Sequence, residues 1–155
     1  MFADPTGVHA ATFAAVFVAL YVAHQVGDHW VQTQRQADCK GQPGWPGRIA
    51  CVAHVVTYTA TALLALLFLT AGTGLRLDPS GVAVGLGISA VTHYIADRRT
   101  PLRWIADRTG AGRFYRLGVP RPGHDDNPSL GTGAYALDQS WHIGWLFIAA
   151  LFCAV

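Results

Sequence analysis

Three pairs of histidine and aspartate, each pair four residues apart, are the side chains in this sequence best suited to chemistry. The pairs are His24 and Asp28, His93 and Asp97, and Asp138 and His142. A further histidine, His54, lies in another apolar stretch. Residues four apart lie one turn apart on the same face of a helix. Imidazole and carboxylate groups together bind zinc, iron or manganese, so the spacing indicates a site for one or two divalent metal ions.

The composition is typical of a membrane protein. Of the 155 residues, 52% are hydrophobic and 13% are charged, whereas an average soluble domain has about 25% charged residues. The formal net charge is only +2, and the basic residues do not form the patch that a nucleic-acid-binding surface needs. We therefore expect membrane lipid around the protein and no nucleic-acid partner.

Four apolar stretches predict an all-α, polytopic membrane protein. About 20 apolar residues are enough for a helix to cross a bilayer, and the first stretch has no Asp, Glu, Lys or Arg from Pro5 to Gly27. We expect spans at about residues 8–36, 48–71, 80–98 and 133–154, forming an up-down bundle in a single domain, 1–155. Thr100–Arg108 mixes apolar and basic residues, which is typical of a short interfacial helix. The Gly/Pro-rich segment 109–133 is expected to be a lid or a disordered loop.

The basic residues predict an orientation. The connection after the first span holds Arg35, Lys40 and Arg48, the second holds Arg76, and the third holds Arg98, Arg99, Arg103, Arg108, Arg113, Arg116 and Arg121. Basic loops stay in the cytoplasm. The first connection and the third, at 99–132, are therefore expected to be cytoplasmic, with both termini outside.

In this orientation the seven His and Asp residues share one depth. Each lies near the cytoplasmic end of its span; His54, for example, is six residues from Arg48, which is about 9 Å at 1.5 Å per residue. The orientation comes from Arg and Lys and the depth from His and Asp, so the two signals are independent. Their agreement predicts a single site shared by all four helices.

A metal ion explains why carboxylates are tolerated there. Each buried Asp costs up to ~3 kcal/mol in a membrane, and a divalent cation supplies the opposite charge. Seven ligands exceed the four of a closed tetrahedral zinc, which indicates two ions, or one ion with Asp97 or Asp138 free to act as a base. A metal ion with an open position lowers the pKa of water to about 7. We therefore expect a hydrolase for a membrane-associated, lipid-like ester or phosphoester, in which Tyr58 donates a hydrogen bond to the substrate and Gln32 supports the ligands.

Other interpretations of the same residues stay open. The polar side chains can serve as hydrogen-bonding contacts between helices, worth about 0.6 kcal/mol each, or as a proton relay or partner site in a protein that is not an enzyme. Asp97 can form a salt bridge with Arg98 or Arg99, and these arginines can instead set the topology or contact a phosphate headgroup. Histidines on facing helices can also bind haem, although the three Asp residues argue against an apolar haem pocket. The sequence does not predict an oligomeric state.

Four segments carry a family resemblance: "AHQVGDHWVQT", "AHVVTY", "THYIADRRT" and "LDQSWHIGW". They resemble the signature segments of a family of small bacterial membrane proteins, the domain of unknown function 3307. The resemblance implies a bacterial inner-membrane location and a shared set of polar residues: His24, Asp28, Gln32, His54, His93, Asp97, Asp138, Gln139 and His142. It adds Gln139 as a second residue that supports the ligands. His29 and Trp30 depart from the pattern, which affects only the packing beside the first pair. The family has no established activity; in type, the layout is also similar to inner-membrane metal-dependent hydrolases.

Overall fold

A computed structural model of the chain describes residues 7–119 and 131–154, and every regular element in those residues is a helix. The helices are α1 (Val8–Val26), a π-helix η1 (Gly27–Val31), α2 (Gln34–Cys39), α3 (Gly44–Thr73), α4 (Pro79–Asp97), α5 (Thr100–Arg108), α6 (Gly112–Tyr115) and α7 (Gly133–Cys153). The prediction of an all-α protein is therefore confirmed.

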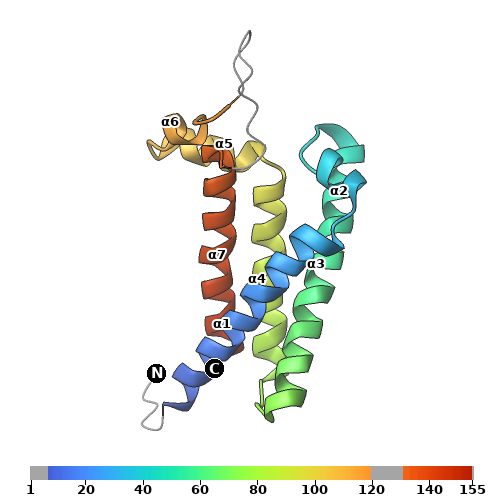
Figure 1. The fold of residues 1–155 in the computed structure, drawn as a ribbon, viewed down its shortest axis with the longest axis vertical. Helices are drawn as coiled ribbons and strands as arrows, with labels where there is room; N and C mark the ends of the chain where they lie inside the picture. The colour runs from blue at the N-terminus through green and yellow to red at the C-terminus, as the bar shows by residue number, and fades with distance from the viewer. Residues whose placement is uncertain (1–6, 120–130, 155) are drawn as a thin grey trace.

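Four long helices, α1, α3, α4 and α7, pack side by side (Figure 1). α1 contacts α3 and α7, and α4 contacts the same two helices, so α1 and α4 lie at opposite corners. The chain runs up α1, down α3, up α4 and down α7. The short helices α2, α5 and α6 therefore lie at one end of the bundle, while the start of α1, the end of α7 and the α3–α4 turn lie at the other.

The first predicted helix, 8–36, is wrong in its last part. After α1 the chain widens into η1, and Gln32 has an extended ψ of 127° that ends the helix. Thr33 then starts α2 with a capping box, in which its hydroxyl accepts the Gln36 amide and the Gln36 side chain accepts the Thr33 amide. Such reciprocal capping satisfies two free amide groups at a helix start. The capping box at Thr33 therefore starts a new helix inside the range predicted as one continuous span.

The other helix ends follow local sequence signals. α3 ends where Gly74 adopts a left-handed φ of 73°, a conformation that glycine adopts without steric cost. α4 starts at Asp78, whose carboxylate accepts the Gly81 amide at 2.9 Å, and α7 starts at Thr132, whose hydroxyl accepts the Tyr135 amide at 3.1 Å. Such N-caps are worth about 1 kcal/mol each. Gly74 therefore marks the end of α3, and the caps at Asp78 and Thr132 mark the starts of α4 and α7.

The end of the bundle near the two termini has an apolar core. Its buried members come from all four long helices: Val16, Leu20, Ala23, Ala62, Leu66, Leu86, Leu146, Ala149, Ala150 and Cys153. Small residues bring α4 and α7 together, because a Cβ at Gly85 would lie 2.7 Å from the carbonyl oxygen of Ala149. Close approach of this kind stabilises helix pairs through van der Waals contact.

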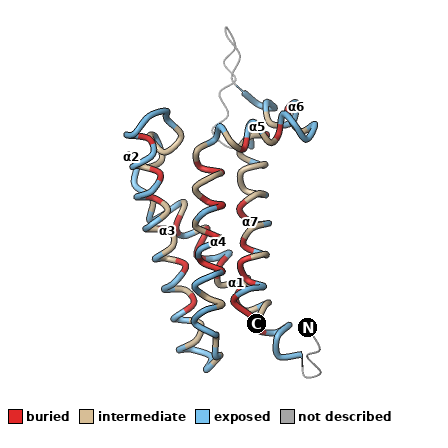
Figure 2. The backbone as a smooth tube through the Cα atoms, turned by 180° about the vertical axis from the view of Figure 1, so that it is seen from behind, coloured by how far each residue is buried: buried red, intermediate tan, exposed pale blue. Residues whose placement is uncertain are grey.

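The outward faces of the long helices carry large apolar side chains. Figure 2 shows exposed and buried residues alternating along α3, α4 and α7, and the exposed ones include Val56, Phe68, Val91 and Phe147. Val8–Val31 and Gly44–Thr73 are long and apolar enough to cross a membrane. These two helices favour a protein that associates with a membrane.

The segment after α4 agrees with the prediction in part. Thr100–Arg108 is the expected short helix. Within the predicted loop, Gly112–Tyr115 forms one further helical turn, α6, which is tied to α5 by an ion pair of 2.7 Å between Arg116 and Asp107. Residues 120–130 of the expected lid or disordered loop lie outside the described residues.

Candidate metal centre

The seven predicted His and Asp side chains lie together, at the end of the bundle next to α2 and α5. They come from every long helix: His24 from α1, Asp28 from the adjoining η1, His54 from α3, His93 and Asp97 from α4, and Asp138 and His142 from α7. His24, His54, His93, Asp97 and His142 are all buried. The predicted convergence on one layer is therefore present in the structure.

Two histidines and two aspartates form the tightest group. The Nε2 atoms of His54 and His93 are 3.0 Å apart. Asp28 Oδ1 lies 3.4 Å from His54 Nε2 and 3.5 Å from His93 Nε2. Asp97 Oδ2 lies 3.3 Å from both of these nitrogens. These four atoms come from α3, α4 and η1.

These spacings match the geometry of a bound metal ion. A tetrahedral zinc ion with nitrogen and oxygen ligands at about 2.0–2.1 Å holds any two ligand atoms about 3.3 Å apart. The five separations that involve at least one of the two histidine nitrogens run from 3.0 to 3.5 Å. The group, made of His54, His93, Asp28 and Asp97, has the ligand types that zinc takes, and neutral imidazole with carboxylate also suits iron and manganese.

A second group of possible ligands adjoins the first. His24, His93 and His142 offer nitrogens within 4.8 Å of one another, and so do the ligand atoms of Asp97, Asp138 and His142. The His142 ring lies 4.2 Å from the His93 ring, between centroids. Since His93 and Asp97 belong to both groups, two ions could share them.

Unpaired polar atoms gather in the cluster. Among the described residues, seven buried side-chain N or O atoms form no hydrogen bond, and all but Thr59 Oγ1 belong to the predicted ligands. Asp28 Oδ1 and Asp97 Oδ2, the two carboxylate atoms of the tightest group, are among them. An unpaired buried acceptor costs about 1–3 kcal/mol, and more when it is charged. A cation at the centre of the group would remove that cost.

Tyr58 supports the cluster in a way that differs from the prediction. Its ring stacks on His93 with centroids 3.9 Å apart, and its hydroxyl pairs with Ser89 Oγ at 2.7 Å. The Cβ that Gly27 lacks would lie 3.2 Å from this ring. Tyr58 is thus placed to orient His93, and the predicted hydrogen bond to a substrate would require its hydroxyl to leave Ser89.

The two predicted supporting glutamines lie beside the ligands. Gln139 places Oε1 3.4 Å from His24 Nε2 and its amide nitrogen 3.3 Å from Asp138 Oδ2, and hydrogen-bonding neighbours of this kind orient metal ligands. The Gln32 side-chain amide is 3.0 Å from His54 Nε2. A metal ion bound to that nitrogen would displace this contact, because the ring nitrogen has a single lone pair.

Lys40 is the site residue that the sequence analysis missed. Its ammonium group lies 2.9 Å from Asp97 Oδ1, and its side chain is only 12% exposed. Asp97 therefore pairs with Lys40, whereas the guanidinium of Arg98 donates to the carbonyl oxygens of Lys40 and Gln42 at 2.5 and 2.6 Å. The alternative of an Asp97–Arg98 salt bridge is wrong. No spacing rule could have found Lys40, because it reaches the cluster only through the fold of the α2 turn.

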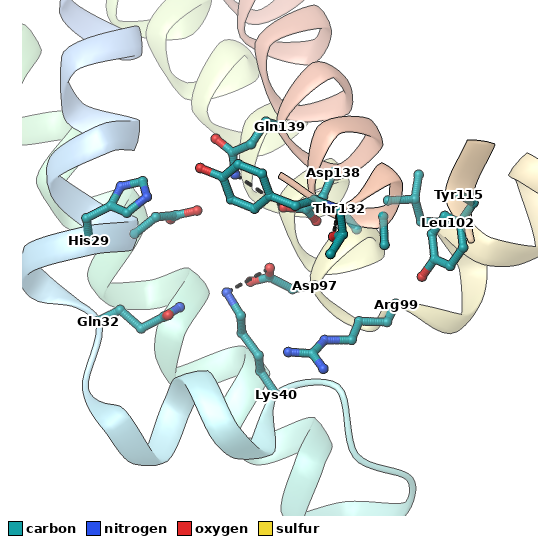
Figure 3. Close-up of a pocket in the computed structure, with 14 residues that line it drawn as sticks. His29, Gln32, Lys40, Asp97, Arg99, Leu102, Tyr115, Thr132, Asp138 and Gln139 are labelled. Atoms are coloured by element: carbon teal, nitrogen blue, oxygen red, sulfur yellow. Dashed lines mark hydrogen bonds and ion pairs between the residues drawn. The ribbon is translucent and has the colours of Figure 1, made fainter. Parts of the chain in front are cut away.

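A cavity of about 530 Å³ connects the cluster with the α2–α5 end of the bundle (Figure 3). Three carboxylates and two cations line it: Asp28, Asp97, Asp138, Lys40 and Arg99. The four histidines of the cluster are buried and do not line the cavity. A small molecule in the cavity would meet the carboxylate side of the cluster first.

The fold and the cluster define a helical protein with a buried His/Asp layer, and the family follows from the sequence. Residues 16–155 match the family described as "Protein of unknown function (DUF3307)", so the chain belongs to that family and the resemblance is confirmed. No curated protein and no solved structure matches the chain.

Proposed function

We propose that this protein is a four-span integral membrane protein of the bacterial inner membrane. We further propose that it binds one or two divalent metal ions and hydrolyses an ester or phosphoester of a membrane-associated substrate. One observation carries the proposal: the Nε2 atoms of His54 and His93 lie 3.0 Å apart, and each lies 3.3–3.5 Å from a carboxylate oxygen of Asp28 and of Asp97. Zinc, iron and manganese are the candidate ions.

Four spans are supported by the outer surface of the bundle. Besides the two helices that pass the length and hydropathy test, α4 exposes Val84 and Val91 and α7 exposes Phe147 and Phe152. In water, an apolar surface running around the whole bundle would promote aggregation. The proposed orientation has both termini outside, so the basic α2 and α5 end faces the cytoplasm.

A test of the orientation uses two reporters fused to the C-terminus. A fluorescent protein that folds only in the cytoplasm should stay dark there, whereas a phosphatase that is active only outside should be active. The same fusions placed after Arg108 should give the opposite result, because that position lies in the proposed cytoplasmic connection. Equal signals at both positions would contradict four spans.

Hydrolysis is supported by how the carboxylates are arranged. A bound divalent ion supplies Lewis acidity and activates water near pH 7. Asp97 directs Oδ2 toward His54 and His93 and Oδ1 toward Lys40, so its role is that of a ligand. Asp138 is 28% exposed, lines the cavity and is 3.7 Å from His142 Nε2. Asp138 is thus the better placed of the two to accept a proton from water in the cavity.

The alternative is a membrane protein without enzymatic activity. Lys40 neutralises Asp97 at 2.9 Å, and ion pairs with His54 and His93 are available to Asp28. These contacts favour a polar network that serves structure, proton transfer or partner binding. Haem is disfavoured for the central pair, because His54 and His93 nitrogens 3.0 Å apart leave no room for a porphyrin between them.

Activity assays on the full chain in lipid nanodiscs separate these functions. Zinc-loaded wild-type protein should release product from at least one carboxyl-ester or phosphoester lipid, and a chelator should stop the release. Asp138→Asn should retain metal and lose most of the activity, while Asp107→Asn, at an exposed carboxylate on α5, should retain both. A metal-loaded protein that turns over none of these lipids would favour the non-enzymatic alternative.

A further inference from the structure

Two cations, Lys40 and Arg99, line the cavity, and neither is a possible metal ligand. Lys40 pairs with Asp97 at 2.9 Å, and Figure 3 shows the guanidinium of Arg99 near Lys40. Together with a single divalent ion, these two cations exceed the charge of the three carboxylates that line the cavity. An excess of positive charge in a partly enclosed space favours an anionic ligand.

Arg99 is held toward the cavity by the backbone around it. It is the only non-glycine among the described residues with a positive φ, at 58°, a conformation that costs of order 1 kcal/mol or more. Its side chain lies across Gly41, where a Cβ would be 2.7 Å from Arg99 Cδ and 2.9 Å from Nε. The strained backbone and the missing side chain at Gly41 together direct the guanidinium toward Lys40, as Figure 3 shows.

The neighbouring arginine has a different task. Both terminal nitrogens of Arg98 donate to backbone carbonyls of the α2 turn. Within the part of the chain that the structure describes, Arg99 forms neither an ion pair nor a side-chain hydrogen bond with another residue. Arg98 thus fixes the segment that carries Lys40, while the guanidinium of Arg99 keeps its donors available for a ligand.

We infer that the cavity binds the phosphate group of a phosphoester, with Arg99 and Lys40 as its cationic contacts and the metal centre on its other side. This inference rests on the proposed metal centre and narrows its substrate class. A guanidinium matches two phosphate oxygens at once, and an ammonium group that has bonded Asp97 keeps two further donors. A carboxylic ester is neutral, so it would leave Arg99 without a counter-charge.

Hydroxyl groups that line the cavity are also suited to a phosphate ligand, because they can donate hydrogen bonds to its oxygens. Tyr115, Thr132 and Tyr135 all line it. Burial raises the pKa of the Tyr115 phenol, so this hydroxyl stays protonated at neutral pH and can donate to a phosphate oxygen. Such hydroxyl donors would add to the contacts that Arg99 and Lys40 make with the phosphate.

Phosphate binding is tested directly on the full chain in detergent. Isothermal titration with inorganic phosphate should show binding to wild-type protein, and Arg99→Gln should weaken it by about 10- to 100-fold, as expected for a lost charged hydrogen bond. Arg99→Lys should bind with intermediate affinity, because it retains the charge. Arg103→Gln is the matched control: this residue is on the same helix, its side chain is 64% exposed, and phosphate affinity should not change.

A second variant moves Arg99 without removing it. Gly41→Ala should push the guanidinium away from the cavity and weaken phosphate binding several-fold, with zinc content unchanged. Vesicles of phosphatidylcholine with and without phosphatidate then identify the source: selective binding to phosphatidate indicates a lipid headgroup, whereas binding of inorganic phosphate alone indicates a soluble phosphate. Both support a phosphate site.

The inference fails if wild-type protein binds neither probe, or if Arg99→Gln and Arg103→Gln bind with equal affinity. Zinc content is measured on the same samples. A protein that binds zinc normally but no phosphate would overturn the substrate class alone. A protein without zinc that still loses phosphate binding on Arg99→Gln would overturn the metal centre and leave the anion site standing.

Discussion

The two halves of the bundle are built from the same four helices and are filled in opposite ways. Toward the termini, Leu20, Leu66, Leu146 and Ala149 fill the interior. Toward α2 and α5, the interior is filled by histidine and aspartate, many with unpaired atoms. The first half gains free energy from close packing, whereas the second half is costly until something neutralises it. A binding site with buried, uncompensated polar groups needs a well-packed part of the fold to hold it in place, and the apolar half supplies this support.

The largest effect should follow from removing a central ligand. His93 contributes to two of the possible metal groups and stacks on Tyr58. His93→Ala should weaken zinc binding by at least about 100-fold, because changes to residues that only hydrogen-bond to ligands already cost about 10–100-fold. A competition titration with a zinc-binding dye measures the change. His29→Ala, at an exposed histidine, should leave the affinity unchanged; if both variants bind alike, the polar half is not a metal site.

A substitution in the apolar half should lower the stability of the protein without changing its metal content. Leu146 is 1% exposed within the core cluster, and Leu146→Ala should lower the free energy of unfolding by about 2–3 kcal/mol through the cavity it leaves. Denaturation in mixed micelles measures this loss, and the folded fraction should bind the same amount of zinc. Leu64→Ala, at a leucine that is 53% exposed, should change stability little. Loss of zinc from folded Leu146→Ala protein would mean that the two halves do not act separately.

Removing a residue that only supports the ligands should weaken metal binding less than removing a ligand. Gln139 Oε1 lies 3.4 Å from His24 Nε2, and Gln139→Ala should weaken zinc binding by about 10–100-fold with little change in unfolding. The control is Gln34→Ala, since the Gln34 side chain pairs with Asp38 on the surface of α2. Equal zinc affinities for these two variants would show that Gln139 does not support the ligands.

The smallest effect is expected at a hydrogen bond between α4 and α7. Trp141 on α7 donates from Nε1 to the carbonyl oxygen of Thr92 on α4 at 3.0 Å. Trp141→Phe keeps an aromatic ring and loses this hydrogen bond, so the free energy of unfolding should fall by about 1 kcal/mol. Trp45→Phe, at a residue that is 73% exposed, should show no loss. A fall above about 3 kcal/mol would show that Trp141 does more than link the helices.

Local sequence rules predicted the helices and the polar layer because both depend on spacing. A four-residue repeat places His93 beside Asp97 in any helix, and the distribution of Arg and Lys put the four sets at one end. Helix starts at Asp78 and Thr132 are likewise set by a single capping side chain. Information of this kind lies within a few residues of each position.

Long-range contacts decided what the sequence did not predict. Asp28 lies in a π-turn that packs against α3, and no local pattern distinguishes such a turn from an α-helix. Lys40 reaches Asp97 only because Arg98 fixes the α2 turn. The hydroxyl of Tyr58 pairs with Ser89, thirty-one residues away. Each of these contacts joins segments far apart in the chain, so their partners appear only when the helices are packed.

Metal content tests the proposed metal centre most directly. Wild-type protein, Asp97→Asn and His54→Ala are purified in detergent without added metal, checked for helical content by circular dichroism, and analysed by inductively coupled plasma mass spectrometry. We predict one or two equivalents of zinc, iron or manganese in the wild type, and a loss of bound metal in both variants at unchanged helicity. A folded wild-type protein that contains no transition metal and takes up none on dialysis would contradict the proposed metal centre.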